Sequence, residues 1–115
     1  MHVIKAIQWE RYALHQLDTI TDFIKYTDKS ASGSGPKRAE QLVDALVNAV
    51  EGLKNFPESN PVDKGLQTKI PVRRMLVRKR YEIRYLIDGN QIIHIVAVYH
   101  VKQARPSISI NKSRR

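Results

Sequence analysis

The hydrophobic pattern changes its period twice along the chain. Residues 3–9 alternate between apolar and polar side chains and end on Trp9, which predicts a first strand. From Glu10 onward, apolar residues recur at steps of three and four on one helical face: Ala13, Leu17, Ile20 and Ile24. A polar segment rich in Ser and Gly, residues 27–35, then predicts a flexible turn.

A second helical pattern follows and is the strongest in the chain. Pro36 suits the first turn of a helix, because its missing N–H is not needed there. Apolar residues again recur at steps of three and four: Ala39, Leu42, Val43, Leu46, Val50 and Leu53. The pair Phe56-Pro57 ends this helix, because the residue before a proline disfavours helical geometry. The two helices and their short link predict a helical hairpin.

Three strands are predicted after a loop over residues 58–69. Their ranges are 70–78, 80–87 and 91–101. The sequence Asp88-Gly89-Asn90 predicts a hairpin turn of the Asp-Gly type between the last two. The last strand is apolar on both faces at its centre, so we expect it to be an inner strand. The predicted order is βααβββ, an α+β fold with a helical hairpin on one face of a mostly antiparallel sheet. The other face is left to solvent or a partner.

Alternation assigns the side chains of these strands to faces. On the strand 80–87, one set is expected to face the core: Tyr81, Ile83, Tyr85 and Ile87. The opposite set is Glu82, Arg84 and Leu86. On the last strand, the pattern predicts one face with Ile93, Ile95, Ala97 and Tyr99. The other face would then carry His94, Val96, Val98 and His100.

The charge of the chain narrows the classes of molecule that it is expected to bind. The 115 residues suit one domain and carry a net charge of +9, from 20 Lys and Arg against 11 Asp and Glu. Residues 1–60 are nearly balanced, and the excess lies in residues 61–115, whose acidic residues are Asp63, Glu82 and Asp88. Such a field attracts polyanions and acidic proteins, so nucleic acid, the ribosome and an acidic partner chain are candidates.

Several classes of chemistry are disfavoured by composition. The absence of cysteine excludes disulfides, thiolate metal sites and a cysteine nucleophile. No apolar run approaches the roughly 18 residues of a membrane-spanning helix, and the N-terminus lacks the layout of a signal peptide. We therefore expect a cytoplasmic protein without membrane contact. The histidines show no metal-ligand spacing and there is no glycine-rich phosphate loop, so no metal and no cofactor are indicated.

The order of these pieces resembles the RelE/ParE superfamily of bacterial toxins. The resemblance is carried by Trp9, Leu53-Lys-Asn-Phe-Pro57, Gly65, Arg73/Arg74-Met75-Leu76, Tyr81-Glu-Ile83-Arg-Tyr85 and Ile95-Val-Ala-Val98-Tyr-His100. It implies one toxin domain over residues 1–106, and we expect residues 107–115 to form a mobile basic tail. It further implies a type II toxin–antitoxin system, in which an acidic or amphipathic antitoxin binds the toxin in a hetero-oligomer.

Two activities occur within this superfamily, and Glu82 bears on the choice between them. RelE-like members cut mRNA on the ribosome and carry an Arg at the position of Glu82, where a carboxylate would repel phosphate. YoeB-like members use a His that matches His100. Arg84 is expected on the same face as Glu82, where its positive charge would compensate for the carboxylate. The ending from His100 to Pro106 resembles the ParE side, whose members act on DNA gyrase.

We therefore favour a ParE-like toxin that inhibits growth through gyrase. A ribosome-dependent mRNA endonuclease of the RelE, YoeB or HigB type, with His100 and Arg84 as its catalytic pair, is the alternative. A degenerate, non-toxic binding module of the same fold is a third hypothesis. For His100, a strand-end residue that pairs with a neighbour is the simpler interpretation.

Basic residues of the C-terminal half form the candidate surface for target or antitoxin. They are Arg73, Arg74, Arg78, Lys79, Arg80, Lys102 and Arg105. The competing interpretation is a charged edge strand that discourages aggregation. Both carry similar weight, because the run coincides with the charge asymmetry of the chain.

Overall fold

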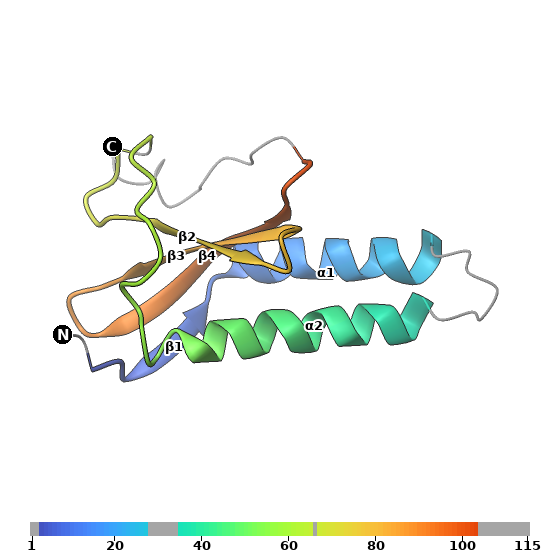
Figure 1. The fold of residues 1–115 in the computed structure, drawn as a ribbon, viewed down its shortest axis with the longest axis horizontal. Coiled ribbons are helices and arrows are strands. Elements are labelled where there is room, and N and C mark those ends of the chain that lie inside the picture. The colour runs from blue at the N-terminus through green and yellow to red at the C-terminus, as the bar shows by residue number, and fades with distance from the viewer. Residues whose placement is uncertain (1–2, 28–34, 66, 104–115) are drawn as a thin grey trace.

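A helical hairpin lies against one face of a four-stranded sheet (Figure 1). The computed structural model describes residues 3–27, 35–65 and 67–103. The elements are β1 (Ala6–Trp9), α1 (Arg11–Thr27), α2 (Gly35–Gly52), β2 (Arg73–Val77), β3 (Tyr81–Ile87) and β4 (Ile92–His100). The α+β class and the βααβββ order are confirmed. No helix within the described ranges is long and apolar enough to cross a membrane.

The sheet has the strand order β1-β4-β3-β2, which confirms β4 as an inner strand. β1 runs parallel to β4, and the other two pairings are antiparallel. β1 is shorter than predicted and pairs only with the first half of β4, from Ala6 opposite Ile92 to Trp9 opposite Ile95. The chain turns into α1 directly after Trp9, so no strand of the described residues flanks the second half of β4 on that side.

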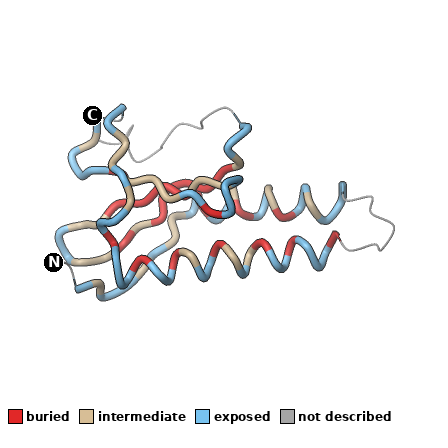
Figure 2. The backbone as a smooth tube through the Cα atoms, in the orientation of Figure 1, coloured by how far each residue is buried: buried red, intermediate tan, exposed pale blue. Residues whose placement is uncertain are grey.

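Each helix buries the apolar face that its sequence predicts. In α1 the buried positions Ala13, Leu17 and Thr21 are spaced by four residues. α2 begins at Gly35, with Pro36 in its first turn as predicted, and buries five positions: Gly35, Ala39, Leu42, Leu46 and Val50. Figure 2 shows buried residues recurring along both helices and concentrated on the central strands. The predicted turn over residues 27–35 lies mostly outside the described residues.

A bulge in β4 changes which residues share a face. Arg84 of β3 lies opposite Ala97, but the next residue, Tyr85, lies opposite Ile95. Val96 is therefore an extra residue on β4, and the side-chain alternation reverses across it. The alternation pattern alone contains no sign of such an insertion.

Two apolar clusters define the faces after this correction. The helix face of the sheet carries Ile83, Tyr85, Ile93, Ile95 and Val98. The second face carries Val72, Leu86, Val96, Ala97 and Tyr99, with Tyr12 packed against them. The prediction that Ala97 and Tyr99 share a face with Ile95 is therefore wrong. The expectation of an open second face is also wrong, because its central residues are buried.

The turn between β3 and β4 lies where it was predicted but has a different geometry. The side chain of Asp88 accepts hydrogen bonds from the backbone N–H groups of Asn90 and Ile92, at 2.7 and 3.1 Å. The left-handed position is Gln91, with φ of 66°, rather than Gly89. The connection between β3 and β4 spans residues 88–91, one residue longer than the predicted turn Asp88-Gly89-Asn90.

Candidate functional site

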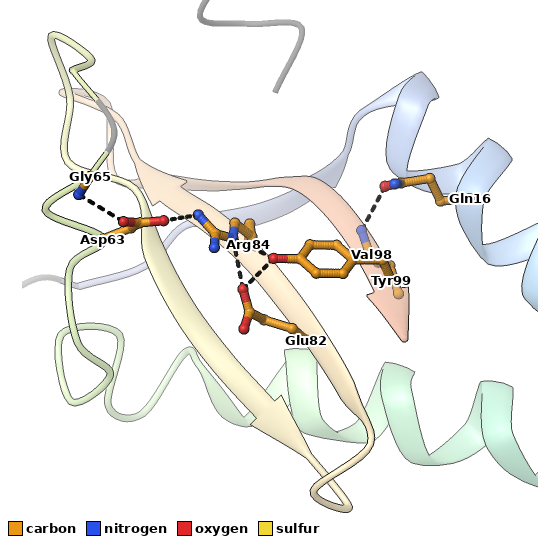
Figure 3. A network of polar contacts seen from close by, with 7 residues as sticks. All are labelled: Gln16, Asp63, Gly65, Glu82, Arg84, Val98 and Tyr99. Carbon is orange, nitrogen blue, oxygen red and sulfur yellow. Dashed lines mark hydrogen bonds and ion pairs between the residues drawn. The ribbon is translucent and has the colours of Figure 1, made fainter. Parts of the chain in front are cut away.

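The second face of the sheet holds a buried ionic network centred on Arg84 (Figure 3). The Arg84 side chain is 2% exposed and lies between two carboxylates, those of Asp63 and Glu82. Its Nη1 donates to Asp63, and its Nε lies 2.8 Å from Glu82 Oε2 and 3.1 Å from the Tyr99 hydroxyl. The Tyr99 hydroxyl in turn donates to Glu82. The network thus joins β3, β4 and the loop before β2.

The network keeps the Arg84 guanidinium ionised, and its two carboxylates offset the positive charge. Burial alone would lower the pKa of Arg84, but the hydrogen bond to Asp63 and the contacts with Glu82 raise it above its ordinary value. Burial and the hydrogen bond to Glu82 raise the pKa of Tyr99. A guanidinium held by two carboxylates has little charge left to offer a phosphate group.

Asp63 reaches Arg84 because its loop pairs with the edge of β2. Val62 forms an isolated antiparallel bridge with Arg73, and the Asp63 N–H donates to the carbonyl of Val72 at 2.8 Å. The Oδ1 atom of Asp63 accepts the N–H of Gly65 at 2.8 Å, which orients the carboxylate (Figure 3). Sequence reasoning missed Asp63 as a partner of Arg84. Its only signal was a rare acidic residue in the basic half of the chain.

His100 lies on the other side of the sheet from Arg84. Its ring contacts Tyr81 edge-on, with centroids 5.1 Å apart, and Tyr81 packs against the helix-face core. His100 Nδ1 accepts the backbone N–H of Lys102 at 3.0 Å, so the ring stabilises the turn after β4. The structure therefore does not bring the hypothetical nuclease pair together: Arg84 is buried on the second face and His100 is on the helix face.

The β2–β3 hairpin presents a cluster of cations. Arg78 and Lys79 both have left-handed backbones, with φ of 55° and 59°, and the Arg80 N–H donates to Val77 O at 3.1 Å. This is the geometry of a type I′ turn, which normally uses Asn and Gly. The N–H of Val101 donates to Arg80 O at 2.8 Å, which places Lys102 beside the turn. We call the exposed residues Arg78, Lys79, Arg80 and Lys102 the cationic tip.

The remaining basic residues of the predicted surface have different environments. Arg73 is half-buried, and its Nη1 donates to the carbonyls of Glu58 and Asn60 at 3.1 and 2.7 Å. Arg74 lies opposite Arg84, and its Nε is buried. Arg105 lies outside the described residues. Within the described ranges, none of the ion pairs involves a member of the cationic tip.

A second ionic contact on the second face was also missed by sequence reasoning. His94 Nδ1 lies 2.9 Å from Glu10 Oε2, and His94 Nε2 lies 2.7 Å from Asp88 Oδ2. It links the start of α1 to the β3–β4 turn. The part of the chain that the structure describes holds no group of three or more His, Asp or Glu side chains placed to bind a metal ion.

Comparisons with known proteins show which fold and which family this chain shares. A solved structure described as the chromosomal ParDE TA system from P. aeruginosa superimposes with a TM-score of 0.64 at 20% identity, covering 89% of this chain and 100% of that one. At that identity the likeness shows a shared fold, that of a chain from a toxin–antitoxin system. A search of curated protein sequences finds no match. Residues 7–105 match the family of the ParE toxin of the type II toxin–antitoxin system parDE, and the chain belongs to that family.

Proposed function

We propose that this toxin inhibits growth by acting on DNA gyrase in the cytoplasm and that a cognate antitoxin neutralises it in a hetero-oligomer. The observation that carries the choice of target is the environment of Arg84. A nuclease needs an accessible cation beside the reacting phosphate, whereas Arg84 is 2% exposed and held by Asp63 and Glu82. The family match supports the proposal independently.

The cationic tip is the part of the molecule best suited to contact the target. Its four side chains are exposed, and those of Arg78 and Lys79 project from a turn whose backbone geometry normally uses Asn and Gly. Non-glycine residues held in left-handed geometry cost free energy and are concentrated at functional sites. The presence of two cations at positions with left-handed backbone geometry supports a functional role for their charge.

A supercoiling assay with purified gyrase tests the proposal. The wild-type toxin should inhibit supercoiling, and Arg78→Gln/Lys79→Gln should raise the concentration for half-inhibition by at least ~10-fold if each cation loses a desolvated contact. The matched control is Lys64→Gln/Lys69→Gln, which removes two exposed charges from the loop before β2. This control should behave as the wild type.

The alternative activity predicts a different result. A ribosome-dependent endonuclease would cut a translated message at the codon in the A site, which primer extension detects. Such cuts, together with their loss in His100→Ala and an unaffected gyrase, would overturn the proposal. A toxin that neither inhibits gyrase nor cuts mRNA, and that allows normal growth when well expressed, would be the degenerate binding module.

A further inference from the structure

The cationic tip is built from two turns that lie side by side at one end of the sheet. Figure 1 shows the β2–β3 turn next to the point where the chain leaves β4. The Val101 N–H donates to Arg80 O at 2.8 Å and joins the two turns directly. Lys102 therefore belongs to the same surface as the three cations of the β2–β3 turn.

Hydrogen bonds to the backbone hold both turns in one conformation. The Arg80 N–H closes the β2–β3 turn by donating to Val77 O at 3.1 Å. In the turn after β4, the Gln103 N–H donates to His100 O at 2.9 Å and the Lys102 N–H donates to His100 Nδ1 at 3.0 Å. Because the backbone that carries these cations is already ordered, less conformational entropy is lost when they bind a ligand.

The positive charge of the tip is not offset by the acidic residues of the C-terminal half. Asp63 and Glu82 pair with the buried Arg84, and Asp88 pairs with His94. Among the described residues, no ion pair includes a cation of the tip. In a protein of net charge +9, such a surface concentrates polyanions around it.

The composition of the tip favours a nucleic-acid backbone over a protein surface as its partner. Residues 78–80 present three exposed cations in succession, while Val77 before them is buried and Tyr81 after them is half-buried. The centre of a protein–protein contact is depleted in charge, whereas contacts with nucleic acid are polar and strongly positive. Arg and Lys bind phosphate oxygens through charge-assisted hydrogen bonds.

We infer that the cationic tip binds the phosphate backbone of duplex DNA, and that in the cell this is the duplex on which gyrase acts. The second part rests on the proposed function. Because the contact is with the backbone, it depends on charge and carries no preference for base sequence. The tip then holds the toxin on the DNA beside the enzyme, and the rest of the toxin is left to contact gyrase itself.

Binding of a fluorescent DNA duplex to the full-length toxin, measured by anisotropy at several salt concentrations, tests the phosphate contact. Each neutralised phosphate contributes about −0.9 to the slope of log K against log salt, so the four tip cations predict a slope at least as steep as about −3.6. Arg78→Gln/Lys79→Gln should make the slope less steep by about 1.8 and weaken binding by at least ~10-fold at ~100 mM salt. Duplexes of unrelated sequence should bind within ~3-fold of one another.

Matched variants separate a local contact from the effect of net charge. Lys64→Gln/Lys69→Gln removes two charges from exposed positions in the loop before β2 and should keep the wild-type slope. Arg78→Lys/Lys79→Arg keeps both charges in the tip and should also keep it. If the loop variant flattens the slope as much as the tip variant, net charge alone attracts the DNA and the inference is overturned.

A further variant guards against a loss caused by misfolding. Arg78→Asn/Lys79→Gly removes the same two charges but supplies residues that favour the turn. It should lose DNA binding as Arg78→Gln/Lys79→Gln does, with a circular dichroism spectrum like that of the wild type. Full DNA binding by this folded variant would overturn the inference.

Crosslinking identifies the macromolecule that the tip contacts on gyrase. Because the chain has no cysteine, Lys79→Cys places a single thiol in the tip for attachment of a photoreactive group. In the assembly of toxin, gyrase and DNA, irradiation should join this position to the DNA, and Lys64→Cys should give far less of that product. Crosslinks from the tip to a gyrase subunit alone would show a protein contact and overturn the inference.

These outcomes separate the inference from the proposed function. If the wild type inhibits supercoiling but Arg78→Gln/Lys79→Gln binds DNA with the same affinity and slope as the wild type, the DNA contact is overturned and gyrase stands as the target. If the wild type binds DNA through the tip but leaves supercoiling unaffected, the action on gyrase fails and the phosphate contact stands.

Discussion

The two faces of the sheet are stabilised in different ways. On the helix face, side chains from both helices and from β3 and β4 form a continuous apolar core. On the second face, a smaller apolar cluster surrounds the Arg84 network, and the contact of His94 with Glu10 and Asp88 lies toward the β3–β4 turn. Burial of apolar surface stabilises the helix face and does not depend on the direction of individual contacts. The second face depends on a few specific hydrogen bonds.

This difference determines what each face contributes. Apolar packing tolerates substitution by residues of similar volume, so the helix face mainly supplies stability. A buried ion pair costs desolvation that its attraction only partly offsets, so the Arg84 network contributes little net stability and instead fixes the loop at Asp63 against β3. The second face therefore orders the loop before β2, and the helix face holds the fold together.

The largest expected effect is a truncation in the helix-face core. Ile95→Ala should lower the free energy of unfolding by about 4 kcal/mol, because Ile95 is fully buried and its removal leaves a cavity. Ile95→Val should cost only about 1 kcal/mol. Urea denaturation followed by circular dichroism measures both. Equal, small losses would mean that this face is not a close-packed core.

The next largest effect is expected from a variant of the ionic network on the second face. Arg84→Met removes the cation but leaves the carboxylates of Asp63 and Glu82 in a poorly exposed site, at 9% and 12%. We expect a loss of about 3 kcal/mol in the free energy of unfolding, because two poorly exposed carboxylates lose the cation that offsets their charge.

A compensating variant distinguishes this cause from lost packing. Arg84→Met/Asp63→Asn/Glu82→Gln removes all three charges at similar volume and should recover most of the loss of the single variant. If the triple variant is less stable than Arg84→Met, the cost arises from packing and hydrogen-bond geometry rather than from unpaired charge.

The contrast between the faces also explains which features the sequence predicted correctly and which it did not. The helix positions and the β3 core residues Ile83 and Tyr85 follow simple periods, and the structure confirms them. The face of Tyr99 was mispredicted, because the insertion of Val96 depends on pairing between strands and leaves no mark in local alternation. The Asp63–Arg84 contact spans 21 positions and depends on how a loop meets β2, which no local pattern encodes.

The turn between β2 and β3 gives a prediction of opposite sign. Arg78→Asn/Lys79→Gly should raise the free energy of unfolding by about 1.5 kcal/mol, because Asn and Gly adopt left-handed geometry readily. Arg78→Ala/Lys79→Ala removes the same charges and keeps the unfavourable geometry, so it should give no such gain. Thermal denaturation compares the three proteins, and equal stability of both variants would locate the effect in charge repulsion.

The smallest effect concerns His94, the other ionic contact of the second face. Burial alone would lower the pKa of His94, but hydrogen bonds to Asp88 and Glu10 raise it above its ordinary value. The hydrogen bond with His94 lowers the pKa of Asp88, so that carboxylate stays ionised at mildly acidic pH. A His whose pKa is raised by folding stabilises the protein fully below its unfolded pKa of about 6.5 and loses that contribution as pH rises through the folded pKa.

His94→Gln should therefore be less stable than wild type by about 1 kcal/mol at pH 6, where the imidazolium bridges two carboxylates, and the difference should shrink toward pH 9. Urea denaturation at both pH values measures it. His15→Gln is the control, because it removes an exposed imidazole of α1 that belongs to no ion pair within the described residues. A difference for His94→Gln that grows with pH would mean that the neutral ring is the stabilising form. The contact of His94 with Glu10 and Asp88 would then depend on hydrogen bonds of the neutral imidazole rather than on charge.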